Sequence, residues 1–265
     1  MTMTGRSCAV SAVGVAAVVA LWAVTATADT ECFSTHTSGA GETYFAFCIS
    51  EHGNVVQLES PEGFEHLAVG VIGEGYVLCS FEAFHGYDAG FAELGLLAPT
   101  ISQPNGPNTF PLTITRDTSD GKLRLRQTFS RDNSEKDLRV TMTVTNRTAL
   151  RIRAVNLHRY FDGDIDGGGT NNRYATTPDS VWGWKDGADH HGLMLTALTF
   201  STYHFAVMER YANWDPTAGG SASSCAPNTI GDFTVPGNFV GRVGYVLGDL
   251  AAGQSKTVSV LYSRF

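Results

Sequence analysis

The chain has 265 residues, of which 43% are hydrophobic and 17% charged, with 29 Gly and 9 Pro. This composition is typical of a globular protein with a substantial core, and it excludes a disordered, collagen-like or coiled-coil chain. The formal net charge of -8 is unevenly distributed. No Lys or Arg lies between Arg6 and Arg116, whereas the stretch from Arg116 to Arg159 is rich in bases. The overall acidity argues against nucleic acid and anionic membrane surfaces as general partners.

Residues 1–28 have the organisation of a signal peptide. Arg6 precedes an apolar run from Ala9 to Val24, and Ala26-Thr27-Ala28 is the small-x-small pattern of a signal peptidase site. We therefore expect a mature chain of residues 29–265 that is secreted or periplasmic and has no membrane span. A membrane anchor is the alternative, but no basic stop-transfer residues follow the run.

Four cysteines remain in the mature chain: Cys32, Cys48, Cys79 and Cys225. An even number in an oxidising compartment predicts two disulfides. Of the three connectivities, local geometry favours Cys32 with Cys48, because a hairpin that turns at Ser38 to Gly41 would place residues 32 and 48 opposite each other. Cys79 would then pair with Cys225. A zinc site is the alternative, although no two cysteines have Cys-x-x-Cys spacing.

Alternation of apolar and polar residues with a period of two dominates the mature chain. In Lys122 to Phe129, Leu138 to Thr145 and Leu150 to Phe161, it places Arg and Thr on a shared face. Further strands are predicted at residues 44–50, 55–59, 69–78, 193–200, 203–208, 242–247 and 256–262. Short helical turns are expected only at residues 60–67 and 91–97. Ten or more short strands predict an all-β fold, a large antiparallel β-sandwich that forms a single domain.

The alternation turns the basic stretch into a predicted surface. If the three strands form a meander, one sheet face presents Arg124, Arg126, Arg139, Arg151 and Arg153. Arg binds carboxylate, sulfate or phosphate through two parallel hydrogen bonds, so this face predicts binding of an acidic polysaccharide or another polyanion. Alternatively, these arginines pair with the acidic residues of the segment 29–93, in neighbouring strands or in a covering loop.

A Gly-rich acidic loop follows the third of these strands. Carboxylates that alternate along such a loop are ligands for a hard cation, so the sequence predicts a calcium site. The predicted ligands are Asp162, Asp164, Asp166, Asp186 and Asp189. The loop is not an EF-hand, because Arg173 stands where a bidentate Glu is required. The alternative is an acidic turn whose Asp side chains bond to their own backbone.

Aromatic residues form the next candidate site. Trp182 and Trp184 flank Gly183 and would share one face of a strand, with Gly183 leaving the opposite face open. Trp214 follows within about thirty residues. Flat aromatic faces stack against the C-H groups of sugar rings, so an exposed Trp pair predicts a carbohydrate platform, whereas core packing is the alternative.

The segment Asn156-Leu-His-Arg-Tyr-Phe-Asp162 resembles the part of aldose 1-epimerases in which a His-x-Tyr-Phe-Asn run follows an Asn-Leu pair. The resemblance implies the galactose-mutarotase-like β-sandwich and implies that His158 is a general acid for ring opening. The late catalytic Glu of that family has no counterpart, because no Glu follows Glu209. Only Asp215, Asp232 or Asp249 would then complete the catalytic pair.

These features favour a secreted β-sandwich that binds an extracellular carbohydrate or another polyanion without catalysis, with calcium ordering the Asp162–Asn172 loop. One alternative is a carbohydrate-active enzyme of the epimerase or lyase type that uses His158 as acid or base. The other is a structural surface subunit. Esterase, zincin and nucleotide-binding functions lack support, since the sequence contains no Gly-x-Ser-x-Gly, His-Glu-x-x-His or phosphate-binding Gly loop.

Overall fold

The computed structural model describes residues 31–67, 73–81, 84–88, 95–131, 137–168, 172–185, 191–210 and 237–265. Several sequence predictions lie outside these residues: the signal peptide at 1–28, Asp186, Asp189, Trp214 and Cys225. Within the described residues, no helix has both the length and the apolar character needed to cross a membrane.

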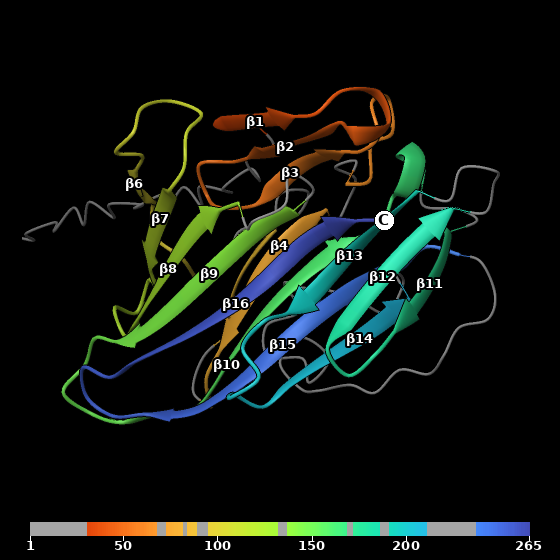
Figure 1. Cartoon of the computed structure of the whole chain (residues 1–265). Coiled ribbons are helices and arrows are strands. Elements are labelled where there is room, and N and C mark those ends of the chain that lie inside the picture. Colours follow the sequence, from red (N-terminus) through yellow and green to blue (C-terminus); the bar gives the residue numbers. More distant parts are fainter. Residues whose placement is uncertain are drawn as a thin grey trace, which may run out of the picture.

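Two antiparallel sheets face each other, and a small third sheet lies along the top edge in the view of Figure 1. The eight-stranded sheet has the order β11 (Asn172–Thr176), β12 (Ser180–Lys185), β13 (Gly192–Ala197), β16 (Ser255–Arg264), β9 (Asp137–Asn146), β8 (Leu123–Ser130), β7 (Leu112–Asp117) and β6 (Thr100–Ser102). The five-stranded sheet has the order β14 (His204–Arg210), β15 (Phe239–Leu250), β10 (Ile152–Asp162), β4 (Glu74–Cys79) and β5 (Phe84–Asp88). The third sheet contains β1 (Ser34–Ser38), β2 (Phe45–Ile49) and β3 (Val55–Glu59).

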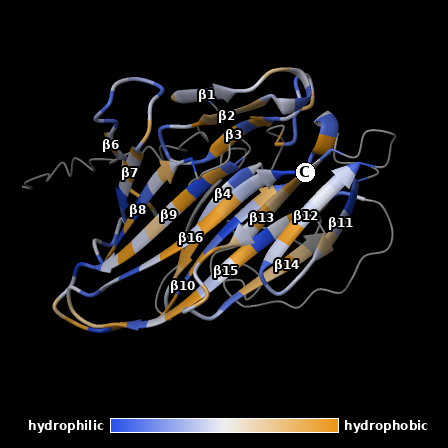
Figure 2. Ribbon diagram, in the orientation of Figure 1, coloured by the Kyte–Doolittle hydropathy of each residue, from blue (hydrophilic) through white to orange (hydrophobic). Residues whose placement is uncertain are grey.

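The space between the two large sheets is filled by the apolar faces of alternating strands, which confirms the all-β sandwich. Along β8 and β9 every second side chain is buried, and the residues between them are half-buried or exposed. Figure 2 shows this alternation as orange and pale bands on the front sheet. Leu125 and Val140 from this sheet join Leu157 and Val243 from the other in one continuous core cluster. Burial of this apolar area drives the two sheets together.

The predicted three-strand meander is wrong. Strands β8 and β9 pair, but β10 crosses to the other sheet and lies between β15 and β4. The crossing starts at Asn146, whose buried side-chain amide donates to the carbonyl groups of Leu150 and Leu250. Most of β10 is buried on both of its faces, so it is a central strand and not the outer strand of a meander. Consequently Arg151 and Arg153 do not share a face with the arginines of β8.

Two local predictions also need correction. Residues 60–67 form no helical turn, because their backbone groups bond to β3 and to each other; the His66 amide, for example, donates to the Leu58 carbonyl. Elsewhere in the described residues, short 3-10 helices occur at η1 (Gly41–Thr43) and η2 (Ile165–Gly167). In the N-terminal hairpin, η1 lengthens the predicted turn, so that Cys48 lies opposite Thr35 and not opposite residue 32.

The disulfide predicted between Cys32 and Cys48 is present, with a Cα–Cα distance of 5.6 Å. Cys79 is also disulfide-bonded. Because Cys225 lies outside the described residues, the Cys79–Cys225 pairing stays a prediction.

Replacing both Cys32 and Cys48 with Ser should lower the free energy of unfolding by about 3 kcal/mol. The two cysteines are separated by 16 residues, and the loss of a cross-link of this span releases roughly that much denatured-chain entropy. Urea unfolding of the double variant measures the change. A loss below about 1 kcal/mol would show that the hairpin is held by its strand pairing and not by the cross-link.

Candidate functional site

The predicted Trp pair lies on the outer face of the eight-stranded sheet. Strand β12 buries Val181 and Gly183 between the sheets and leaves Trp182 and Trp184 half-buried on the solvent side. Trp182 lies opposite Met194 of β13, and Trp184 lies opposite Arg173 of the edge strand β11. The shared face of the two indoles is therefore confirmed, and core packing of this pair is excluded.

The inner side of β12 is filled, in contrast to the prediction that Gly183 leaves it open. A methyl group at position 183 would lie 2.4 Å from the ring of Phe239, and one at position 163 would lie 2.5 Å from the same ring. Phe239 is fully buried and packs against Tyr174 with a centroid distance of 4.3 Å. The two glycines thus make room for an aromatic ring that supports the Trp strand from below.

A shallow hollow of about 200 Å³ lies beside the Trp pair and is lined by Trp182, Met194 and Phe265. Phe265 follows β16 and is 48% exposed. The hollow is smaller than the roughly 300–1,000 Å³ typical of pockets for drug-sized ligands. It is therefore suited to a ring-sized apolar group and not to a whole oligosaccharide.

Hydroxyl groups cover the same outer face from the Trp strand β12 to β7. Threonine and serine side chains bond to each other across neighbouring strands, at distances from 2.8 to 3.2 Å. The pairs are Thr113 with Thr128, Thr141 with Ser259, Thr143 with Thr257, Thr145 with Ser255, and Ser180 with Thr196. Each hydroxyl keeps hydrogen-bonding capacity for a ligand. The sequence showed the alternating Thr residues, but their cross-strand partners depend on the register.

Most of the predicted basic surface is engaged within the protein. Arg124 donates twice to Asp117, at 2.7 and 2.9 Å, and Arg147 donates to the same carboxylate at 2.7 Å. Hydrogen bonds from Arg124 are the main cause that lowers the pKa of Asp117. Asp117 lies on β7, outside the acidic segment 29–93, so the predicted pairing with that segment is wrong for Arg124.

The other arginines differ in their surroundings. Arg151 lies 3.7 Å from Asp249, and the Arg153 guanidinium lies 4.6 Å from the centre of the Phe81 ring. Arg139 is half-buried on β9. Arg126 is exposed and makes no ion pair with any residue that the structure describes. Arg126 is therefore the basic side chain on this face that is best placed to meet an anionic ligand.

His158 lies on β10 and is fully buried. Its Nδ1 is 3.2 Å from a terminal nitrogen of Arg242, and its ring meets Phe205 edge-on at 5.3 Å. Because a guanidinium only donates, Nδ1 must accept, which assigns the proton of the neutral imidazole to Nε2. Asp249 lies near the other end of the β10–β15 pair, beside Arg151, and is not brought to His158. Asp215 and Asp232 lie outside the described residues.

The acidic loop brings two of its carboxylates together. Asp162 is 2% exposed, and burial followed by the charge of Asp164 raises its pKa to about 8. Burial also raises the pKa of Asp164. Asp166 is placed differently, with its Oδ1 4.0 Å from Nδ1 of His66. In the described part of the chain, no three His, Cys, Asp or Glu side chains are grouped so as to hold a metal ion.

No family model and no curated protein matches this sequence. The fold is nevertheless similar to solved structures. A galactose mutarotase-like protein from Lactobacillus casei matches with a TM-score of 0.50 and 12% identity, over 88% of this chain and all of the other. A bacterial glucoamylase complexed with acarbose matches with a TM-score of 0.59 and 9% identity, over 89% of this chain and 32% of the glucoamylase chain. The chain thus spans about a third of that protein, and the predicted resemblance to the galactose-mutarotase-like sandwich is confirmed as a resemblance of fold.

Proposed function

We propose that this protein binds an extracellular carbohydrate on the outer face of its eight-stranded sheet, with Trp182 and Trp184 as the stacking platform. The observation that carries the proposal is the outward orientation of two neighbouring indoles on a strand supported by Phe239. Both similar structures have carbohydrate-related names, a galactose mutarotase-like protein and a glucoamylase complexed with acarbose, which agrees with this choice of ligand.

The chemistry of the face suits a sugar chain. Side chains two residues apart on a strand are separated by about 6.6 Å, so both indoles offer flat apolar surface to adjacent rings. The hydroxyl pairs next to them offer donors and acceptors to sugar hydroxyls. Four strand spacings separate β12 from β8, about 19 Å. A ligand that contacts both the Trp pair and Arg126 must therefore be an extended, acidic polysaccharide.

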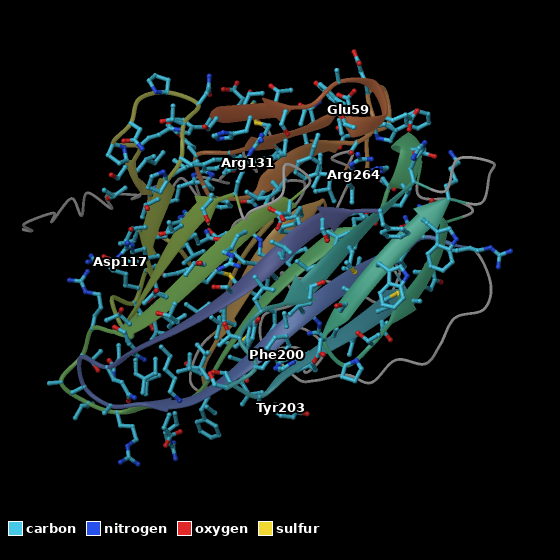
Figure 3. All side chains as sticks on the ribbon, in the orientation of Figure 1. Glu59, Asp117, Arg131, Phe200, Tyr203 and Arg264 are labelled. Atoms are coloured by element: carbon cyan, nitrogen blue, oxygen red, sulfur yellow. A yellow bond between two sulfur atoms is a disulfide. The ribbon has the colours of Figure 1, made fainter. Side chains whose placement is uncertain are left out.

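Replacing Trp182 or Trp184 with Ala should weaken binding at least about ten-fold, since a buried aromatic anchor contributes more than roughly 1.4 kcal/mol. A glycan array with neutral and acidic polysaccharides identifies the ligand, and calorimetry then measures its affinity for each variant. Phe200→Ala is the matched control, because Phe200 is 65% exposed and lies on the turn after β13 (Figure 3). The Phe200→Ala variant should bind the carbohydrate with the same affinity as the unchanged protein.

Two results would contradict the proposal: no binding across a broad panel, or a ligand whose affinity is the same for both Trp variants and for Phe200→Ala. Arg126→Gln separates the two ligand types. It should weaken binding of an acidic polysaccharide, in a salt-dependent way, and leave that of a neutral one unchanged.

A further inference from the structure

The loop between β10 and β11 is flanked by buried oxygen atoms that have no hydrogen-bond partner among the residues that the structure describes. The Oδ1 atoms of Asp162 and Asn172 are both in this state, although their residues are 2% and 0% exposed. Buried polar atoms in proteins are nearly always paired, because an unpaired one loses its hydration without replacement. Two such acceptors at the two ends of one loop therefore need an explanation.

The amide of Asn172 is fixed with its oxygen free. Its Nδ2 donates to the carbonyl oxygens of Gly163 at 2.5 Å and Gly168 at 2.9 Å, which lie at the two ends of the loop that carries Asp164. These bonds place the amide inside the loop and commit both of its donor hydrogens. The side-chain oxygen of Asn172 is therefore left as a pure acceptor that is held in place and accepts from no donor in the described part of the chain.

Asp162 is linked to this amide through its neighbour Gly163, whose carbonyl accepts from Asn172. Asp162 directly precedes Gly163, and the Asp164 amide donates to the Asp162 carbonyl at 3.1 Å. The Asp162 side chain is buried, and that of Asp164 is half-buried. A buried carboxylate oxygen and a buried amide oxygen that both lack a donor are unfavourable unless a positive charge joins them.

We propose that Asp162, Asp164 and Asn172 bind one hard divalent cation of the calcium type. Calcium accepts carboxylate, amide and backbone oxygens together with water, so two carboxylates are sufficient when amide oxygens complete the shell. The donor set contains no thiolate or imidazole, which disfavours zinc. The Oδ1 atom of Asp166 also has no hydrogen-bond partner among the described residues, but it lies 4.0 Å from Nδ1 of His66, so we do not assign it to the site.

A cation here would act on the Trp face through β11. Asn172 is the first residue of β11 and lies opposite Lys185, next to the pair formed by Arg173 and Trp184. The turn η2 contacts β12 (Figure 1). Fixing Asn172 therefore fixes the edge strand that borders Trp184. The cation site itself does not rest on the proposed carbohydrate binding, because its donors are not part of the Trp face.

Calorimetric titration of CaCl2 into the chelator-treated full chain tests the site, together with thermal unfolding in CaCl2, MgCl2 or chelator. We expect one calcium per chain and a Tm several degrees higher with calcium than with chelator. Asp162→Asn and Asp164→Asn should each weaken calcium binding at least ten-fold. The matched control is Asp249→Asn, an exposed Asp at the other end of the sandwich, which should bind calcium as the unchanged protein does.

The Asp162→Asn variant also reports on folding. In chelator its Tm should be close to that of the unchanged protein, because Asn has nearly the same size and Asp162 Oδ1 makes no hydrogen bond with any described residue. If Asp162→Asn keeps this Tm but no longer binds calcium, the loss of binding does not come from misfolding and supports the site. The inference is overturned if the unchanged chain shows neither calcium heat nor a Tm shift, or if Asp162→Asn binds calcium as tightly as Asp249→Asn.

Discussion

Replacing Arg159 with Met is expected to lower the free energy of unfolding by about 3–5 kcal/mol, the cost of leaving a buried charge without its partner. Arg159 is fully buried between the sheets. Its Nε and one terminal nitrogen donate to the two carboxylate oxygens of Glu74, at 2.5 and 3.0 Å. Burial raises the pKa of Glu74, and the positive charge of Arg159 acts against that shift. Without Arg159, Glu74 would have to carry an uncompensated charge in the core or take up a proton.

The arginine also connects the three sheets. Glu74 belongs to the five-stranded sheet and accepts from the Val55 amide of the third sheet at 2.7 Å. Tyr262 of the eight-stranded sheet donates its hydroxyl to the same carboxylate. Arg159 itself donates to Gln127 of β8 at 2.5 Å. The loss of Arg159 therefore affects packing in every layer of the molecule.

Urea unfolding measures this effect, and Arg124→Met is the control. The Arg124–Asp117 pair is partly exposed, and pairs of this kind contribute about 0–1 kcal/mol. The double variant Glu74→Gln with Arg159→Met should recover part of the loss, because it removes the unpaired charge. If Arg159→Met is no more destabilising than Arg124→Met, the buried pair does not contribute as we infer.

Phe239→Ala should have a comparable effect, with a loss of about 3–5 kcal/mol. Its ring fills the space above Gly163 and Gly183, so truncation leaves a cavity directly beneath the Trp strand. Carbohydrate affinity should fall together with stability, because the platform loses its support. Phe239→Leu should restore most of the stability, since it refills much of the volume.

The matched control for this prediction is Phe200→Ala, where the side chain is exposed and the expected change is within about 0.5 kcal/mol. Unfolding in urea gives the stabilities and calorimetry the affinities. An unchanged affinity in a destabilised but folded Phe239→Ala variant would show that the indoles keep their positions without this ring.

Strand alternation predicted much of the fold, because a half-buried sheet imposes a period of two on the residues that face the core. It failed for β10, which is covered on both faces, so that Leu157, His158 and Arg159 are all buried. Ala154 has a positive φ of 50° within an irregular stretch of the strand, which breaks the alternation between Arg153 and Arg159. The choice of sheet for β10 depends on long-range pairing that no local pattern contains.

The candidate site, like the fold, could be predicted only in part from the sequence. The common face of Trp182 and Trp184 follows from their spacing along one strand. Phe239, which supports them, comes from a strand far along the chain in the other sheet, and nothing in the local sequence around Gly183 indicates which side chain fills the gap. The Arg124–Asp117 pair likewise follows from the register of β7 with β8, which the sequence left open.

The position of β16 in the eight-stranded sheet has a consequence for how the chain assembles. This strand comes last of those described, yet it lies between β13 and β9, and Tyr262 reaches a carboxylate 188 residues earlier. During synthesis the sheet therefore remains in two separate halves, β11 to β13 and β6 to β9, until β16 joins them. Such dependence on contacts distant in sequence slows folding and prolongs exposure to aggregation. We therefore expect the sandwich to fold in one cooperative step, and only after β16 has been synthesised.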